Sequence, residues 1–108
     1  RAFAALKDCA RTVGQAGDMN RMLANATVYL DAFGHVVVAW LWLRQALVAG
    51  AALAQQPDHP DEDFYRGKLA ACRYFYAHEL PSVHAKFTLV ASLDDSCLTM
   101  QDSWFTGR

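Results

Sequence analysis

The segment spanning residues 31–54 is apolar on nearly every side of a helical wheel, and it limits how the rest of the chain can fold. Only Asp31, His35, Arg44 and Gln45 interrupt the apolar run. A helix that is apolar all round is either buried among other helices or lies in a membrane. A spanning helix needs about 20 mostly apolar residues, and Arg44 divides this run into uncharged pieces that are too short. The segment therefore predicts a central helix wrapped by its own neighbours, and no membrane span.

A first helix is predicted over residues 2–16. Apolar Phe3, Leu6 and Val13 recur there at three- and four-residue intervals, which is typical of an amphipathic helix. Gly17 ends this pattern, since glycine is the usual residue just after a helix.

Asp18 then favours the start of a second helix over residues 19–55, because its carboxylate can accept a hydrogen bond from a free amide of the next turn. This helix contains no proline, and we expect it to bend near residues 25–28, where helix propensity is weakest. Gly34 in this helix, and Gly67 in the next, each weaken a helix interior. We expect both glycines to allow close approach of a neighbouring helix.

Two prolines in the segment 57–60 predict the clearest loop of the chain. A third helix follows over residues 61–79, and Pro81 is expected to kink or break it before the chain continues over 82–92. A short helix over 93–103 comes last. It is expected to close the end of the bundle with four apolar side chains: Leu98, Met100, Trp104 and Phe105.

The predicted fold is all-α: an up-and-down helical bundle of three main helices with a long central helix and a short C-terminal helix. A chain of 108 residues is one domain. Hydrophobic residues make up 54% of it and charged residues 19%, which suggests a module that buries one face against something else. The chain starts at Arg1, and a second-position arginine does not normally permit removal of an initiating Met. We therefore expect residues 1–108 to be part of a longer protein.

The net charge of −1 argues against binding to nucleic acid or to an anionic membrane surface. Cys9, Cys72 and Cys97 are odd in number, far apart and without a CxxC pattern. They are expected to be reduced thiols of a cytoplasmic protein.

Three polar residues of the apolar segment are candidate ligand or interface residues. Asp31 and His35 are four apart on one helix, so their side chains can meet. A carboxylate that orients an imidazole is half of a general-base arrangement. No nucleophile motif accompanies the pair, so a buried or subunit-interface hydrogen bond is the favoured interpretation. Arg44 needs a carboxylate, carbonyl oxygens or a path to water, and we expect its partner elsewhere in the whole protein.

The predicted third helix carries a small basic patch of Arg66, Lys68 and Arg73, interleaved with Tyr65 and Tyr74. Such a face could hold a phosphate or stack on an adenine. More often such a face is simply the solvated side of an amphipathic helix, and that is the favoured interpretation.

No metal site and no catalytic residue are predicted. His78 and His84 are six residues apart with Pro81 between them, whereas zinc-binding histidines of a helix lie four apart. The acidic run 61–63 suits the positive end of a helix dipole better than a cation site.

Several blocks resemble one protein family when they are taken together. The blocks are Tyr29-Leu-Asp-Ala-Phe-Gly-His-Val, Trp40, Trp42-Leu-Arg, Phe64-Tyr-Arg-Gly-Lys-Leu-Ala, Tyr74-Phe-Tyr and Leu80-Pro. They are similar to an extra C-terminal helical domain of acyl-CoA dehydrogenases, in the branch that includes methylmercaptopropionyl-CoA dehydrogenase-like enzymes. The similarity extends over about residues 19–105.

The resemblance implies a parent flavoenzyme that removes two hydrogens across the α–β bond of an acyl-CoA. In that family a glutamate takes the α-proton and FAD takes the β-hydride, and neither part lies in these residues. The implied partners are the dehydrogenase core of the same polypeptide, further copies in a homo-oligomer and, for the parent enzyme, acyl-CoA. The alternative is a stand-alone helical module that binds a partner helix or a nucleotide-like ligand.

Overall fold

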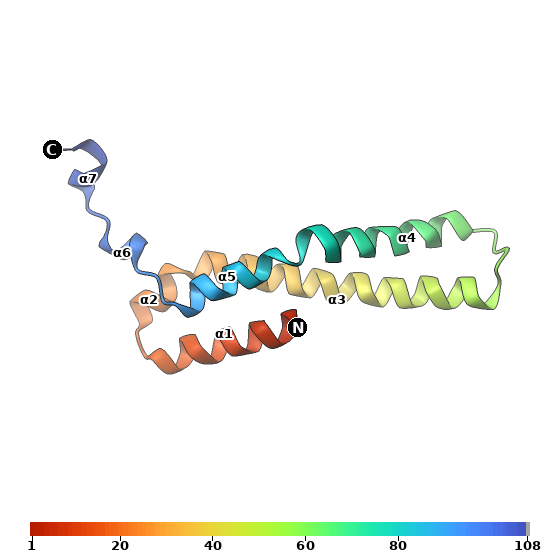
Figure 1. Cartoon of the computed structure of the whole chain (residues 1–108), viewed down its shortest axis with the longest axis horizontal. Coiled ribbons are helices and arrows are strands. Elements are labelled where there is room, and N and C mark those ends of the chain that lie inside the picture. The colour runs from red at the N-terminus through yellow and green to blue at the C-terminus, as the bar shows by residue number, and fades with distance from the viewer. Residues whose placement is uncertain (108) are drawn as a thin grey trace.

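The structure, a computed structural model, describes residues 1–107, and its regular elements over that range are all helices. They are α1 (Ala2–Ala16), α2 (Met19–Ala24), α3 (Ala26–Gln55), α4 (Glu62–Tyr74), the π-helical turn η1 (Phe75–Glu79), α5 (Ser82–Ala91), α6 (Ser96–Thr99) and α7 (Asp102–Thr106). Helix α3 runs along most of the molecule, with α4 beside its second half and α1 and α5 beside its first half (Figure 1). The predicted all-α bundle with a long central helix is confirmed.

The helix boundaries follow the local signals in the sequence. The side chain of Asp18 accepts a hydrogen bond from the Arg21 amide at 3.2 Å, as expected of an N-cap. The predicted bend is a short break at Asn25, whose φ of −110° and ψ of 12° separate α2 from α3. The predicted third helix is α4 and η1 together, and it ends just before Pro81.

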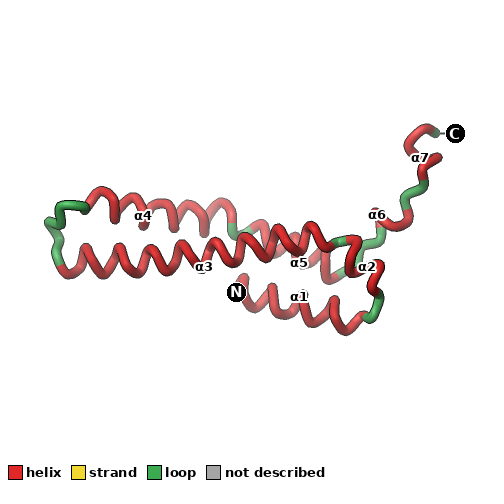
Figure 2. Tube along the Cα trace, turned by 180° about the vertical axis from the view of Figure 1, so that it is seen from behind, coloured by secondary structure: helices red, strands yellow, loops and turns green. Residues whose placement is uncertain are grey.

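The hydrophobic core lies in the half of the molecule where three helices meet. Its buried residues come from α1, the start of α3 and α5: Leu6, Cys9, Val13, Ala32, Val36, Val83, Phe87 and Val90. Three helices can enclose side chains between them, so this half is a small but closed core. The second half of α3 has α4 as its main neighbour (Figure 2).

The expectation that α3 is wrapped by its own neighbours is wrong. The buried residues of this 30-residue helix are Ala32, Val36, Ala39 and Ala49. The described part of the chain extends over 68 × 34 × 15 Å, so it is close to a single layer of helices, and α3 keeps an apolar outer face open to water. By length and composition alone α3 could cross a membrane, but core helices of soluble proteins pass the same test. The absence of a membrane span therefore stays a prediction.

The expected close helix crossings at Gly34 and Gly67 are also wrong for contacts among the described residues. A Cβ atom added at either glycine would have no heavy atom of a neighbouring element within 4 Å. Helix α3 meets α4 through other positions, so neither glycine is required by packing within the described chain.

The end of the chain differs from the single closing helix predicted over 93–103. It forms two short turns, α6 and α7, with an extended Met100 between them. This segment leads away from the helices, so it does not close the bundle (Figure 1). Its large apolar side chains are exposed instead: Leu98, Met100, Trp104 and Phe105.

Candidate functional site

An apolar groove of about 930 Å³ opens where the start of α1, the middle of α3 and the joint between η1 and α5 come together. Its wall on α3 includes Phe33, Val36, Val37, Trp40 and Leu43. The other walls are Arg1, Ala2, Phe3 and Leu6 from the start of the chain, and Tyr76, Leu80, Pro81 and His84 from η1 and its connection to α5.

The groove exists because α1 covers only part of one row of apolar side chains along α3. Val36 is buried in the three-helix core, and the same stripe continues as Trp40 and Leu43, which are exposed. The π-helical turn adds to the groove at this level. The Tyr76 hydroxyl donates a hydrogen bond of 2.9 Å to the carbonyl oxygen of Ala39, which fixes the tyrosine ring at the groove wall. Single π turns inside helices often occur at functional sites.

The groove is chemically suited to binding and not to catalysis. Arg1 and His84 are the basic side chains that line it, and no carboxylate does so among the described residues. An apolar wall with a few convergent polar groups is the usual form of a binding surface. The groove holds neither a nucleophile beside a base nor a pair of carboxylates.

The candidate pair Asp31 and His35 does not form the expected buried hydrogen bond between side chains. His35 donates from Nδ1 to the Asp31 carbonyl oxygen at 3.0 Å, and its Nδ1 is 3.8 Å from the Asp31 carboxylate. That carboxylate is exposed and accepts a hydrogen bond from the Lys86 ammonium on α5. The Nε2 atom of His35 lies 3.6 Å from the Glu79 carboxylate. The buried form of the prediction is therefore wrong, and a contact at a subunit interface stays a prediction.

The hydrogen bond from Lys86 holds the pKa of Asp31 below its ordinary value, because the ammonium favours the charged carboxylate. Lys86 and Glu79 were not identified from the sequence. They lie 55 and 44 positions beyond their partners Asp31 and His35, and no local spacing marks such contacts.

The remaining basic candidates do not gather at one point. Arg44 is exposed, with its guanidinium 5.0 Å from the centre of the Trp40 ring. Arg66 pairs with Glu62 at 2.8 Å, whereas the Lys68 ammonium lies over the ring of Trp42. Side chains that are two positions apart on a helix point to nearly opposite sides. Arg66 and Lys68 therefore do not share an anion site. Arg73 lies exposed in the last turn of α4.

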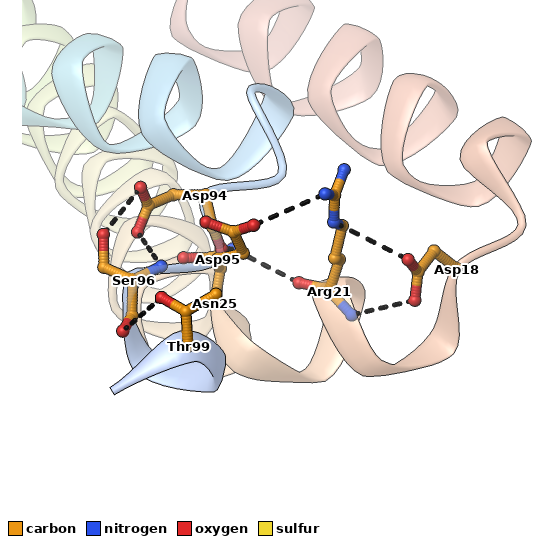
Figure 3. Close-up of polar contacts among 7 residues, drawn as sticks. All are labelled: Asp18, Arg21, Asn25, Asp94, Asp95, Ser96 and Thr99. Carbon is orange, nitrogen blue, oxygen red and sulfur yellow. Dashed lines mark hydrogen bonds and ion pairs between the residues drawn. The ribbon is translucent and has the colours of Figure 1, made fainter. Parts of the chain in front are cut away.

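A polar cluster beyond the core joins α2 and the start of α3 to the segment that follows α5 (Figure 3). Asn25 is buried, and its amide donates to the carbonyl oxygens of Arg21 at 3.2 Å and Asp94 at 2.9 Å. Beside it, the Arg21 guanidinium reaches the Asp95 carboxylate at 3.4 Å. The cluster holds the α2–α3 break against the segment after α5, so its role is structural. The sequence carries no signal for it, because its partners are about seventy positions apart.

Comparison with known proteins identifies the family. The family model described as "Acetyl-CoA dehydrogenase C-terminal like" matches residues 1–101. The broad-specificity linear acyl-CoA dehydrogenase FadE5 of Mycobacterium tuberculosis is 30% identical over 77 residues, which is 71% of this chain and 13% of that protein. A butyryl-CoA dehydrogenase of Syntrophomonas wolfei is 33% identical over 81 residues, or 74% of this chain and 13% of that protein. No solved structure matches the chain significantly. The chain belongs to the acetyl-CoA dehydrogenase C-terminal like family.

Proposed function

We propose that this chain is the C-terminal helical domain of a longer, cytoplasmic acyl-CoA dehydrogenase, in which it packs against the dehydrogenase core and supports the oligomer. The family match over residues 1–101 carries the proposal. The matched segment accounts for only 13% of each relative's length, which leaves ample chain for a separate catalytic core. The free thiols of the described residues suit a reducing compartment.

The open face of α3 supports a packing role. Leu30, Val37, Leu41, Leu47 and Val48 are all exposed there although they are large and apolar. Full burial of such a side chain contributes roughly 1.5–3 kcal/mol. Domains usually consist of at least two packed layers, whereas this chain is close to a single layer. The core of the parent enzyme is the proposed second layer.

The residues of this chain do not fit FAD, the cofactor proposed for the parent enzyme. A flavin dinucleotide carries a pyrophosphate, which needs clustered N–H donors such as a glycine-rich turn at the start of a helix. The groove offers Arg1 and His84 among carbon-rich walls. The flavin and the chemistry of desaturation therefore belong to the rest of the parent protein, and no catalytic role is assigned here.

The proposal is tested with the full-length protein that carries this domain. The purified protein is expected to contain flavin and to reduce an artificial electron acceptor when it is given a straight-chain acyl-CoA. The same assay with butyryl-CoA, longer acyl-CoAs and methylmercaptopropionyl-CoA assigns the substrate branch. The 108-residue chain alone is expected to show neither flavin absorbance nor turnover. A full-length protein without flavin, or turnover by the short chain, would contradict the proposal.

A further inference from the structure

The backbone is strained at Leu93, which directly follows the last turn of α5. Its φ is +56°, and within residues 1–107 it is the only residue other than glycine with a positive φ. An L-residue in this left-handed region is disfavoured by about 5- to 30-fold against the right-handed one. Glycine is the usual residue just after a helix for this reason. Strain of this kind is typical of clamps and switch segments, where the surrounding structure maintains it.

The core holds Leu93 from one side. Its side chain is partly buried and packs against the hydrophobic core. Its amide donates a hydrogen bond of 3.0 Å to the carbonyl oxygen of Val90, and the Ser92 amide donates to that of Thr88 at 3.1 Å. Helix α5 is therefore regular up to this point, and its last turn cannot move to relieve the strain.

Two contacts hold the chain from the other side of Leu93. We call them the clamp: Asn25 with Asp94, and Arg21 with Asp95 (Figure 3). The Asn25 amide donates to the Asp94 carbonyl oxygen at 2.9 Å, and the Arg21 guanidinium lies 3.4 Å from the Asp95 carboxylate. Asn25 is only 5% exposed, so little water competes for its hydrogen bond. The clamp acts on the two residues that directly follow Leu93.

We propose that Leu93 is a pivot that the clamp holds in its strained conformation, and that the clamp thereby sets the direction in which the tail, residues 96–107, leaves the body of the molecule. When the clamp opens, Leu93 returns to the right-handed region and the tail swings to a new position. This inference goes beyond the proposed function and does not rest on it, because it depends only on contacts within residues 1–107.

The tail follows the clamp because α6 is built on the same two aspartates. The Asp94 carboxylate accepts hydrogen bonds from the Ser96 amide at 3.2 Å and from the Ser96 hydroxyl at 3.0 Å. The Asp95 carbonyl oxygen accepts one from the Thr99 amide at 2.9 Å. Helix α6 also lies against α2, the helix that carries Arg21. A rotation at Leu93 therefore moves α6 as a unit, and α7 with it.

The test measures the distance between the body and the tail in the full-length protein. Spin labels are attached to keto amino acids that replace Gln15 on α1 and Ser103 on α7, both exposed, and labelled copies are diluted with unlabelled ones. Pulsed electron paramagnetic resonance should give one main distance. Asn25→Ala should move most of the population to a second distance, whereas the control Asn20→Ala on α2 should not. A distance that stays the same in Asn25→Ala would overturn the proposal.

A second substitution separates a strained pivot from simple loosening. Glycine adopts the left-handed region about as readily as the right-handed one, so Leu93→Gly removes the strain. In the Asn25→Ala protein it should raise the ratio of the original to the new distance by about 5- to 30-fold. A ratio that stays the same or falls would show that Leu93 is not held under strain, which would overturn the proposal.

The exposed half of the clamp provides a test that leaves the buried Asn25 in place. Arg21→Met removes the contact with Asp95 and should move a smaller part of the population to the same second distance. The matched control is Arg11→Met, an exposed arginine on α1, which should move none. Circular dichroism checks that both variants are folded. Equal distance distributions in the two arginine variants would contradict the role of the clamp.

Discussion

The two halves of α3 lie in different surroundings, although both are apolar. In the first half, α1 and α5 enclose side chains such as Val36 and Phe87 in a core of three helices. In the second half, α4 is the main neighbour, and the buried residues there include Ala49 and Cys72, which are small. Two helices shield only the line along which they touch. The comparison shows that apolar composition makes burial favourable, and that the number of neighbouring helices decides whether burial occurs.

The largest expected effect is a contrast between two phenylalanines. Phe87→Ala removes a side chain that is 3% exposed in the three-helix core, and it should lower the free energy of unfolding by about 3–5 kcal/mol. Phe64→Ala removes an exposed ring on α4 and should change stability by less than about 0.5 kcal/mol. Urea denaturation of both variants measures the difference. Equal losses would mean that the second half has a core of its own.

The polar cluster beside the core should give the next largest effect. Asn25→Ala leaves the Asp94 carbonyl oxygen without its side-chain donor, and it should cost about 1–3 kcal/mol. Asn20→Ala is the matched control, because Asn20 is exposed. Thermal unfolding of the two variants compares them. A control variant as unstable as Asn25→Ala would remove the special role of the cluster.

The helix positions could be predicted from the sequence because they depend on local signals. Asp18 caps its own next turn, and Asn25 lies at the weakest part of a long helical run. Contacts between distant residues, such as that of Lys86 with Asp31, leave no local pattern and were missed. The burial of α3 was predicted wrongly for a different reason. The described residues hold too few helices to cover its apolar face, and the proposed partner there is the core of the parent enzyme.

Glycine substitutions sharpen the comparison at the open positions. Gly67→Ala should stabilise the chain by about 0.5–1 kcal/mol, because the added methyl group meets no neighbouring element and alanine favours the helix. Gly17→Ala should instead cost about 1–2 kcal/mol, since Gly17 has a φ of +69° that an L-residue adopts poorly. Chemical denaturation of the two variants measures whether the free energy of unfolding rises or falls in each. A loss at Gly67 would indicate a close helix contact there after all.

The smallest expected effect concerns the ion pair between α3 and α5. Lys86 lowers the pKa of Asp31 in the folded protein, so the unfolded chain binds the proton more tightly. The stabilising contribution of the pair is therefore present above the unfolded pKa of about 3.9 and is lost as the pH falls through the lower, folded pKa. An NMR titration of the Asp31 carboxyl should show its pKa rising in Lys86→Met. The Asp31 pKa should stay unchanged in Lys7→Met. An unchanged Asp31 pKa in both variants would rule out the pairing with Lys86.

The central claim is that the outer face of α3 is open in this chain and covered in the parent enzyme. The most direct measurement is the rate of thiol labelling at Val48→Cys, a position that is 66% exposed, in the 108-residue chain and in the full-length protein. The same variant unfolded in urea serves as the reference for each protein. Position 48 is expected to react almost as readily in the short chain as in the unfolded chain, and to be strongly protected in the full-length protein. Equal labelling of position 48 in the two proteins would contradict the claim.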